Sequence, residues 1–353
     1  MPVYIGAFAL SILLSLLFCR NKAASDGSKL VWLPVIPILL VSIFRYGVGT
    51  DYFWVYDYGF ESVAEGRAWN YSRFEPGYLA INFLVSYFGG TSFWVFAIVA
   101  ILYHYFIYRF ILDWSDSVPL SLLILFVSQQ WLFSLNAIRQ ALAIAIAAYA
   151  IKYIGKSSIK YFILILIASS MHFMALVFVP LYWLLQKNYS QVGILFCAIF
   201  LFAISSLFPN ILESIASLFG REDYFDSTYS KNRLYYVEFA MALLIAVFVL
   251  IHQSRNQEFS KQYKVLINLA IFGLLAASAS AAIPNAERFD MFFTVSYTVL
   301  IPAMVKRCKT QLASIAMIFF LVGALGARLT YDTYINQDSN GIAEYRLIDL
   351  NII

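Results

Sequence analysis

The sequence predicts an all-α, polytopic integral membrane protein with about twelve transmembrane helices, and three observations support this. Of the 353 residues, 62% are hydrophobic and 12% are charged, whereas charged residues make up about a quarter of an ordinary soluble domain. Apolar runs of nearly membrane-spanning length recur along the whole chain. Aromatic residues reach 18%, which suits rings that face lipid tails or lie at headgroup depth.

The predicted spans follow one another at short intervals. Backbone groups inside a bilayer must bond within their own segment, so each run is expected to be a helix. The runs lie at residues 2–19, 30–44, 91–112, 118–134, 136–154, 159–171, 173–186, 191–208, 234–251, 265–282, 288–305 and 310–327. There is no internal repeat and no soluble-domain insertion, so residues 1–353 are expected to form a single transmembrane domain. The first run lacks a preceding basic residue, which is typical of a retained anchor.

The distribution of Lys and Arg predicts the orientation, because cytoplasmic loops of membrane proteins carry the basic excess. With the N-terminus outside, fourteen basic and four acidic residues lie on the cytoplasmic side, and ten basic and sixteen acidic residues lie outside. The two sides then carry +10 and −6, which together give the chain's net charge of +4. This topology places both termini on the outer side of a bacterial cytoplasmic membrane.

The stretch from Glu75 to Phe88 is apolar enough to be a span, but counting it would invert every later loop. We interpret it as a short re-entrant or interfacial helix on the outer face that ends at Gly89 and Gly90. Irregular backbone at membrane depth is tolerated against protein or a watery cavity. This element is therefore a candidate wall of a site.

Several ionisable residues are expected at the outer helix ends, where each charge is costly unless it is paired or hydrated. Arg139 lies a few residues inside the fifth span with Asn136 and Gln140 beside it, and an arginine cannot lose its proton to escape that cost. We expect it to bind phosphate, the alternative being a structural pair with a buried carboxylate. Arg288 has acidic neighbours, and for it the two interpretations are balanced.

Arg45 closes the second span, where arginines often anchor a helix in the interface. The nearby Gly47, Gly49 and Asp51 favour a ligand-binding role for Arg45, because glycines let a backbone approach a ligand closely.

Three groups are candidate bases. Of the three histidines, only His172 lies at an outer helix end, where a neutral imidazole could take a proton from a sugar hydroxyl. A packed or interfacial histidine is the alternative. Asp51 and Glu75 compete for the same role, and surface salt bridges are their alternative. No DxD, GxxxxGK[ST], HExxH or GxSxG motif occurs, which disfavours nucleotide-sugar, NTPase, metalloprotease and serine-hydrolase chemistry. The cysteines and histidines have no zinc-site spacing, so neither a metal nor a cofactor is expected.

Five short motifs, in order, resemble the EpsG family of bacterial polysaccharide proteins, which is related in role to the Wzy polymerases of O-antigen and capsule assembly. They are RYGVGTDY (residues 45–52), FEPGY (74–78), NAIRQALA (136–143), SSMHFMAL (169–176) and ERFDMFF (287–293). The resemblance implies a membrane-embedded, metal-independent glycosyltransferase that moves a glycan from undecaprenyl pyrophosphate to the next lipid-linked repeat unit outside the membrane.

The resemblance also implies roles for individual residues. Arg139 and Arg45 would hold the pyrophosphate with support from Arg288, and His172 or Asp51 would activate the acceptor hydroxyl. Glu75 would hold sugar hydroxyls or share the base role. The expected partners are the lipid-linked oligosaccharide, membrane lipid, and a flippase and chain-length regulator of the same pathway; no nucleic acid is expected.

Three alternative functions stay open. A flippase or transporter of lipid-linked sugars suits the span count and the intramembrane arginines, but no related halves are evident. A membrane acyltransferase would need a histidine near the cytoplasm, where His104 and His252 are expected. A chain-length regulator or scaffold would tolerate loss of the outer charges. Sugar, linkage, stereochemistry and whether the product is O-antigen, capsule or exopolysaccharide are not encoded in any motif.

Overall fold

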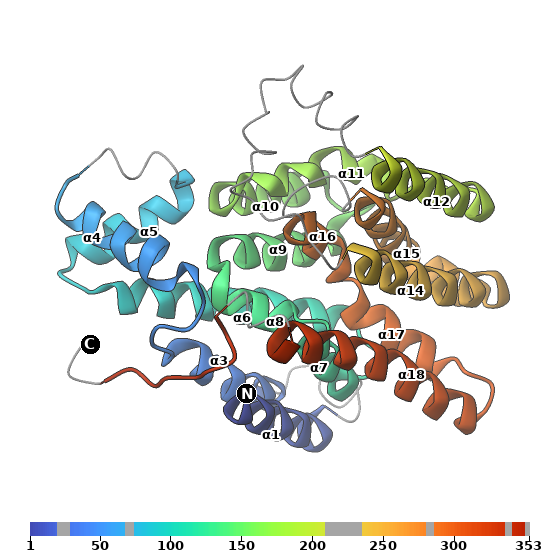
Figure 1. Cartoon of the computed structure of the whole chain (residues 1–353), viewed down its shortest axis with the longest axis horizontal. Coiled ribbons are helices and arrows are strands. Elements are labelled where there is room, and N and C mark those ends of the chain that lie inside the picture. Colours follow the sequence, from blue (N-terminus) through green and yellow to red (C-terminus); the bar gives the residue numbers. More distant parts are fainter. Residues whose placement is uncertain (20–28, 68–73, 209–234, 280–285, 336–340, 350–353) are drawn as a thin grey trace.

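The computed structural model describes residues 1–19, 29–67, 74–208, 235–279, 286–335 and 341–349. Within these ranges the chain is helical, and its β-type contact is an isolated bridge between Arg45 and Leu347. The stretch between the predicted spans at 191–208 and 234–251 lies outside the described residues. The structure confirms a helical membrane protein (Figure 1).

The first half of the chain is helical over the predicted apolar runs, and two further helices, at Tyr52–Asp57 and Tyr58–Ala64, lie where no span was predicted. The helices of this half are α1 (Pro2–Phe18), η1 (Lys29–Val35), α3 (Ile36–Ile43), η2 (Tyr52–Asp57), α4 (Tyr58–Ala64), α5 (Pro76–Tyr87), α6 (Ser92–Trp114), α7 (Val118–Val127), α8 (Gln130–Asn136), α9 (Ile138–Ala150) and η4 (Ile151–Tyr153). Of these, η2 is a π-helix and η1 and η4 are 3₁₀-helices. The predicted helix at 75–88 is present as α5, and Gly89 with φ +71° follows its end. Its place relative to the membrane stays a prediction.

The second half continues in the same manner. It comprises α10 (Ser158–Met171), η5 (Phe173–Val177), α11 (Phe178–Leu184), α12 (Gln191–Leu207), α14 (Tyr235–Arg255), α15 (Gln257–Ser278), α16 (Ala286–Thr294), α17 (Tyr297–Lys306), α18 (Gln311–Thr330) and η7 (Tyr331–Ile335).

The count of twelve spans is not established by this structure. Within the described residues, four helical stretches are long and apolar enough to cross a membrane, and a fifth arises if the bent pair α7 and α8 counts as one span. These two helices meet at 52° around Gln129, which has a left-handed φ of 64°. Other predicted runs form shorter apolar helices; within the run at 173–186, for example, the 3₁₀-helix η5 precedes α11.

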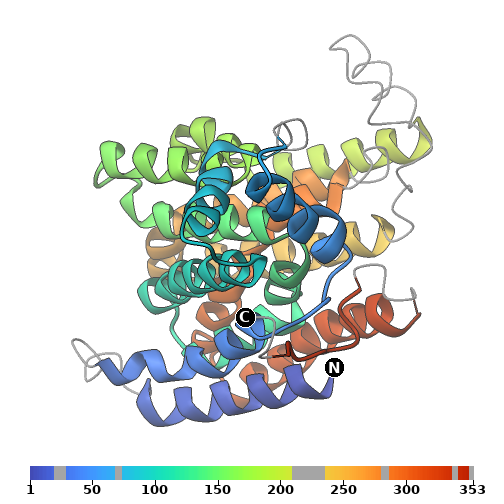
Figure 2. The same ribbon diagram turned by 90° about the vertical axis from the view of Figure 1, so that its left-hand side faces the viewer.

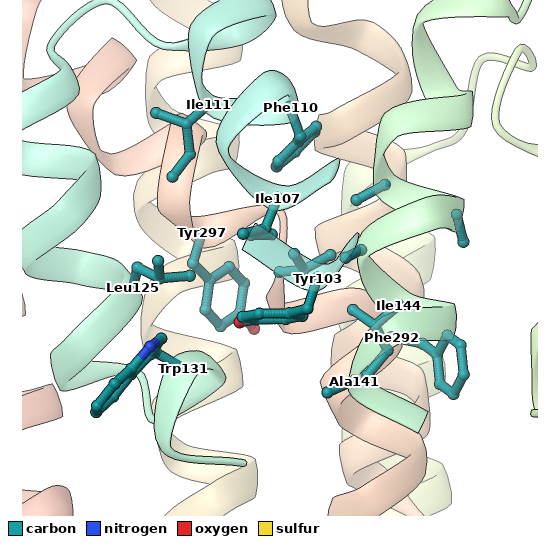
Figure 3. Packing of buried hydrophobic residues seen from close by; sticks show 14 of the residues in the cluster. Tyr103, Ile107, Phe110, Ile111, Leu125, Trp131, Ala141, Ile144, Phe292 and Tyr297 are labelled. Atoms are coloured by element: carbon teal, nitrogen blue, oxygen red, sulfur yellow. The ribbon is translucent and has the colours of Figure 1, made fainter. Parts of the chain in front are cut away.

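Helix α9 lies at the centre of the molecule and is packed against α6 and α10. Its alanines are buried, and small side chains let neighbouring backbones approach closely in membrane proteins. Figure 3 shows how larger side chains fill the remaining space: Tyr103 and Ile107 of α6 lie near Ile144 of α9 and Tyr297 of α17. This packing fixes the start of α9, which carries the candidate site.

The N-terminus lies beside the C-terminal segment at 341–349 (Figure 2). The Met1 ammonium group donates to the Ala343 carbonyl oxygen at 2.7 Å, which joins two segments that the predicted topology assigns to the outer side. Contacts also join loops that the topology assigns to the other side: Asp116 accepts from Arg307 at 2.5 Å and from Tyr263 at 2.8 Å. Which side faces the cytoplasm stays a prediction.

Candidate functional site

Arg139 and Glu75 form an ion pair at the centre of the candidate site. Arg139 belongs to the first turn of α9, and Glu75 is the N-cap residue of α5. Their side chains are 16% and 13% exposed. The guanidinium carbon of Arg139 lies 4.9 Å from the ring centre of Phe74 and 5.6 Å from that of Tyr78. Aromatic faces stabilise a partly dehydrated guanidinium, so FEPGY supplies both a countercharge and a cage for Arg139.

The break after α10 brings His172 to the same place. The backbone N–H of Phe173 donates to Glu75 Oε1 at 3.2 Å, so Glu75 accepts hydrogen bonds on both oxygens. The Met174 N–H donates to His172 Nδ1 at 3.4 Å. Burial lowers the pKa of His172 to about 4; Glu75 opposes this shift, whereas Arg139 and Arg288 add to it. The imidazole is therefore neutral at neutral pH, with its proton on Nε2.

The RYGVGTDY loop places Asp51 against the junction between α8 and α9. The Asp51 N–H donates to Asn136 Oδ1 at 3.0 Å. Gly49 has φ +98°, and a Cβ at this position would lie 2.7 Å from the Leu135 carbonyl oxygen. A glycine is needed here for both reasons. The close approach of the two backbones thus depends on residues from two motifs.

Arg288 of α16 completes the cluster. Its guanidinium lies 3.9 Å from Asp51 Oδ2, and the side chains of the two residues are 41% and 22% exposed. The Gln140 side chain donates to the Arg288 carbonyl oxygen at 2.5 Å, which fixes α16 against α9. All five motifs therefore meet here, although they are dispersed over about 250 residues of sequence.

Arg45 lies apart from this cluster. Its side chain is 2% exposed, donates to the Ser42 carbonyl oxygen at 2.5 Å, and faces the ring of Phe96 at 5.1 Å. Phe96 packs edge-on against Tyr56, and Tyr56 in turn faces Arg139 at 6.0 Å. The three arginines that we expected to share a pocket are thus divided: Arg139 and Arg288 belong to the cluster, and Arg45 is buried behind aromatic side chains. Its role in substrate binding stays a prediction.

Two contacts in the described part of the chain were not foreseen from the sequence. The first is the contact of the C-terminal segment with the RYGVGTDY loop: the Gly49 N–H donates to the Gly341 carbonyl oxygen and the Tyr46 N–H to that of Arg346, both at 2.8 Å. These are backbone contacts, which depend little on side-chain identity. The second is the ion pair of Arg328 with Glu238 at 2.9 Å. The two charges lie at distant helix ends, and spacing along the chain gives no sign of their contact.

The cluster combines two guanidinium groups, two carboxylates and a neutral imidazole. Guanidinium groups bind phosphate oxygens in a bidentate manner, and carboxylates accept protons or hydrogen bonds from hydroxyl groups. Within the described residues, no group of three or more His, Cys, Asp or Glu side chains is arranged to hold a metal ion. Whether the reaction needs a metal stays a prediction.

The comparisons with known proteins give one match. The family model described as the EpsG family matches residues 29–347 of the chain, a range that includes all five motifs. Neither a curated protein nor a solved structure matches.

Proposed function

The chain belongs to the EpsG family, and from this premise we propose that it is a membrane-embedded glycosyltransferase that polymerises polysaccharide repeat units. Its donor would be a glycan on undecaprenyl pyrophosphate, and its acceptor the next lipid-linked repeat unit. The reaction would take place on the outer side of a bacterial cytoplasmic membrane, in a protein of twelve spans with both termini outside. The product would be an O-antigen, a capsule or an exopolysaccharide.

One observation carries this proposal: two arginines and the three candidate bases, from separate segments of the chain, meet in one partly exposed cluster. Charges near a spanning helix are costly, and a purely structural ion pair would need only two of them. The cluster also combines the two functions that glycosyl transfer from a diphosphate requires, namely cations for the leaving group and a proton acceptor for the incoming hydroxyl.

The proposed reaction is a direct displacement at the anomeric carbon. The acceptor hydroxyl oxygen attacks this carbon, the bond from the carbon to the phosphate oxygen breaks, undecaprenyl pyrophosphate leaves, and the hydroxyl proton passes to a base. Because pyrophosphate is already a good leaving group, the protein mainly supplies orientation and positive charge. Arg139 and Arg288 are the cations we assign to the diphosphate, and Arg139 would exchange its bond to Glu75 for a bond to the phosphate. Arg45 would act from behind the aromatic side chains, by positioning the loop that carries Asp51.

Among the three candidate bases, the hydrogen bonds favour Asp51. His172 already accepts a hydrogen bond at Nδ1, so its Nε2 carries a proton and is a donor. Both oxygens of Glu75 already accept hydrogen bonds. Asp51 has the longest ion-pair contact, at 3.9 Å, and is therefore the carboxylate most available to a hydroxyl. Glu75 and His172 would then hold sugar hydroxyls.

The acyltransferase alternative loses support from the position of His104. Trp131 Nε1 donates to His104 Nε2 at 3.0 Å, and His104 Nδ1 lies 2.7 Å from the Ala100 carbonyl oxygen. Both nitrogens are thus engaged in the buried core. Deletion of the gene distinguishes a flippase from a polymerase. If the protein is a flippase, repeat units should stay on the inner leaflet; if it is a polymerase, single units should accumulate on the outer leaflet.

The direct test is polymerisation of purified lipid-linked repeat units by the purified, full-length protein without added nucleotide sugar. We expect a ladder of longer glycans and release of undecaprenyl pyrophosphate. A protein that is folded and monodisperse but gives only single units, including in lipid bilayers, would refute the proposal.

A further inference from the structure

A cavity lies beside the charged cluster, between the π-helix η2, helix α4 and the start of α6. Its volume of about 320 Å³ is at the lower end of the usual range of about 300–1,000 Å³ for ligand sites. Thr91, Ser92 and Phe93 of its wall lie at the outer end of the predicted span at 91–112, and the other lining residues belong to segments that the predicted topology places outside the membrane.

The cavity wall combines aromatic rings with carboxylates. Tyr46, Tyr52, Phe60 and Phe93 supply the rings, and Asp57 and Glu61 supply the acidic groups. Asp57 and Glu61 are four residues apart along a helical segment, so their side chains lie on the same face, and Phe60 lies next to them. Aromatic rings offer a flat apolar surface to the C–H face of a sugar, and carboxylates accept hydrogen bonds from its hydroxyls.

The polar groups of the wall are partly prearranged. Ser92 donates to Asp57 Oδ1, which orients that carboxylate and leaves its second oxygen for a ligand. The Thr91 hydroxyl oxygen is buried and has no hydrogen-bond partner in the described part of the chain. A buried hydroxyl without a partner is unfavourable, and a hydroxylated ligand would supply one.

The charge of the wall identifies the class of ligand. Among the described residues, those that line the cavity include two acidic side chains and no Lys, Arg or His. A diphosphate would be repelled here, whereas a neutral glycan would be accepted. The π-helix links this cavity to the charged cluster, because Tyr52 and Asp57 line the cavity while Tyr56 faces Arg139. Such π-helical turns occur frequently at functional sites.

We propose that this cavity is a saccharide-binding subsite that holds sugar residues of a lipid-linked glycan whose diphosphate lies at Arg139 and Arg288. The proposal rests on the polymerase function proposed above, since that function supplies the glycan. The cavity would then hold the uncharged sugars, and the arginine cluster would hold the charged end of the substrate.

The test measures binding separately from catalysis. The probe is the repeat-unit oligosaccharide released from the host's lipid-linked pool by mild acid and freed of phosphate; inorganic pyrophosphate is the second probe. Binding to the full-length protein in detergent is followed by saturation-transfer NMR. We expect the double variant Asp57→Asn/Glu61→Gln to bind the oligosaccharide about tenfold more weakly, because two charge-assisted hydrogen bonds are weakened. Pyrophosphate binding should be unchanged.

The matched control is Glu65→Gln, which removes an exposed carboxylate of the same segment that pairs with Arg67 outside the cavity. It should bind both probes like the wild type. If the wild type does not bind the oligosaccharide, or if the double variant binds it equally well, the subsite proposal is overturned. Failure of the polymerase function would give a different result. The wild-type protein would then form no glycan ladders, although its oligosaccharide binding would still depend on Asp57 and Glu61.

Discussion

Arg139 donates a hydrogen bond to Glu75, a residue 64 positions earlier in the chain. The pair joins the start of α9 to the start of α5, and aromatic rings from the segment before α5 and from η2 surround the guanidinium. A pair that is largely shielded from water holds its partners firmly, yet a diphosphate brings more charge than one carboxylate and can displace it. The same contact can therefore order the empty site and be exchanged during binding.

Replacement of Arg139 should remove most of the polymerase activity. In Arg139→Ala, the barrier should rise by about 3 kcal/mol, a loss of about a hundredfold in rate, because a cation at the leaving group is lost. The rate of ladder formation from purified lipid-linked units measures this. Arg346→Ala, at an exposed arginine, is the control. Normal chain length and yield from a stable Arg139→Ala protein would reject the assignment.

The ion pair of Arg139 with Glu75 should also stabilise the folded protein, and removal of one partner should cost more stability than apolar replacement of both. Glu75→Gln leaves a buried guanidinium with a neutral partner, so the thermal midpoint of the protein in detergent should fall clearly. Removal of one member of a buried pair typically costs about 3–5 kcal/mol, whereas apolar replacement of both is often nearly neutral. Arg139→Met/Glu75→Leu should therefore be more stable than Glu75→Gln while lacking activity. Additive losses in the double variant would show that the two charges do not act as a pair.

His172 should make stability depend on pH. Its pKa is lowered from 6.5 to about 4 by burial, so the unfolded chain binds a proton more readily than the folded protein. Stability should therefore fall as pH decreases from about 6.5 towards 4, and His172 should contribute no change above this range. The thermal midpoint should drop more between pH 7 and pH 5 in the wild type than in His172→Gln. Equal drops in the two proteins would assign the effect to other groups.

Gly49 should be the most sensitive glycine of the RYGVGTDY loop. A Cβ there would approach the Leu135 carbonyl oxygen, and φ is +98°, so Gly49→Ala must move the loop and with it Asp51. We expect a loss of about tenfold or more in polymerisation rate, since small displacements of catalytic groups reduce rates strongly. Gly66→Ala is the matched control: its φ of +70° is also positive, but open space surrounds it. Equal effects of both substitutions would point to backbone strain alone.

The sequence allowed the helical segments and the motifs of the site to be predicted, because apolar runs and local signals such as Gly89 depend on neighbouring residues. Helix α5 could be recognised for this reason. The contact of Asp51 with Arg288 could be anticipated only as a general convergence at one end of the bundle. The burial of Arg45 behind Phe96 could not be predicted, since it depends on how aromatic side chains from distant helices pack. The breaks that shorten several predicted spans, such as the bend at Gln129, could not be predicted either.

The orientation of the protein can be tested at two positions that the fold separates. Glu65 follows α4, in the segment that we place outside, and Lys309 follows α17, in a loop that we place in the cytoplasm; both are exposed. In a variant with Cys19, Cys197 and Cys308 replaced by alanine, Glu65→Cys should react with a membrane-impermeant maleimide in intact spheroplasts, and Lys309→Cys should react only after permeabilisation. We expect the basic excess near Lys309 to retain that loop inside during insertion. Labelling of Lys309→Cys alone in intact spheroplasts would show that the topology is inverted. The Arg139 cluster would then lie in the cytoplasm, where nucleotide sugars would be available and a lipid-linked donor would no longer be required.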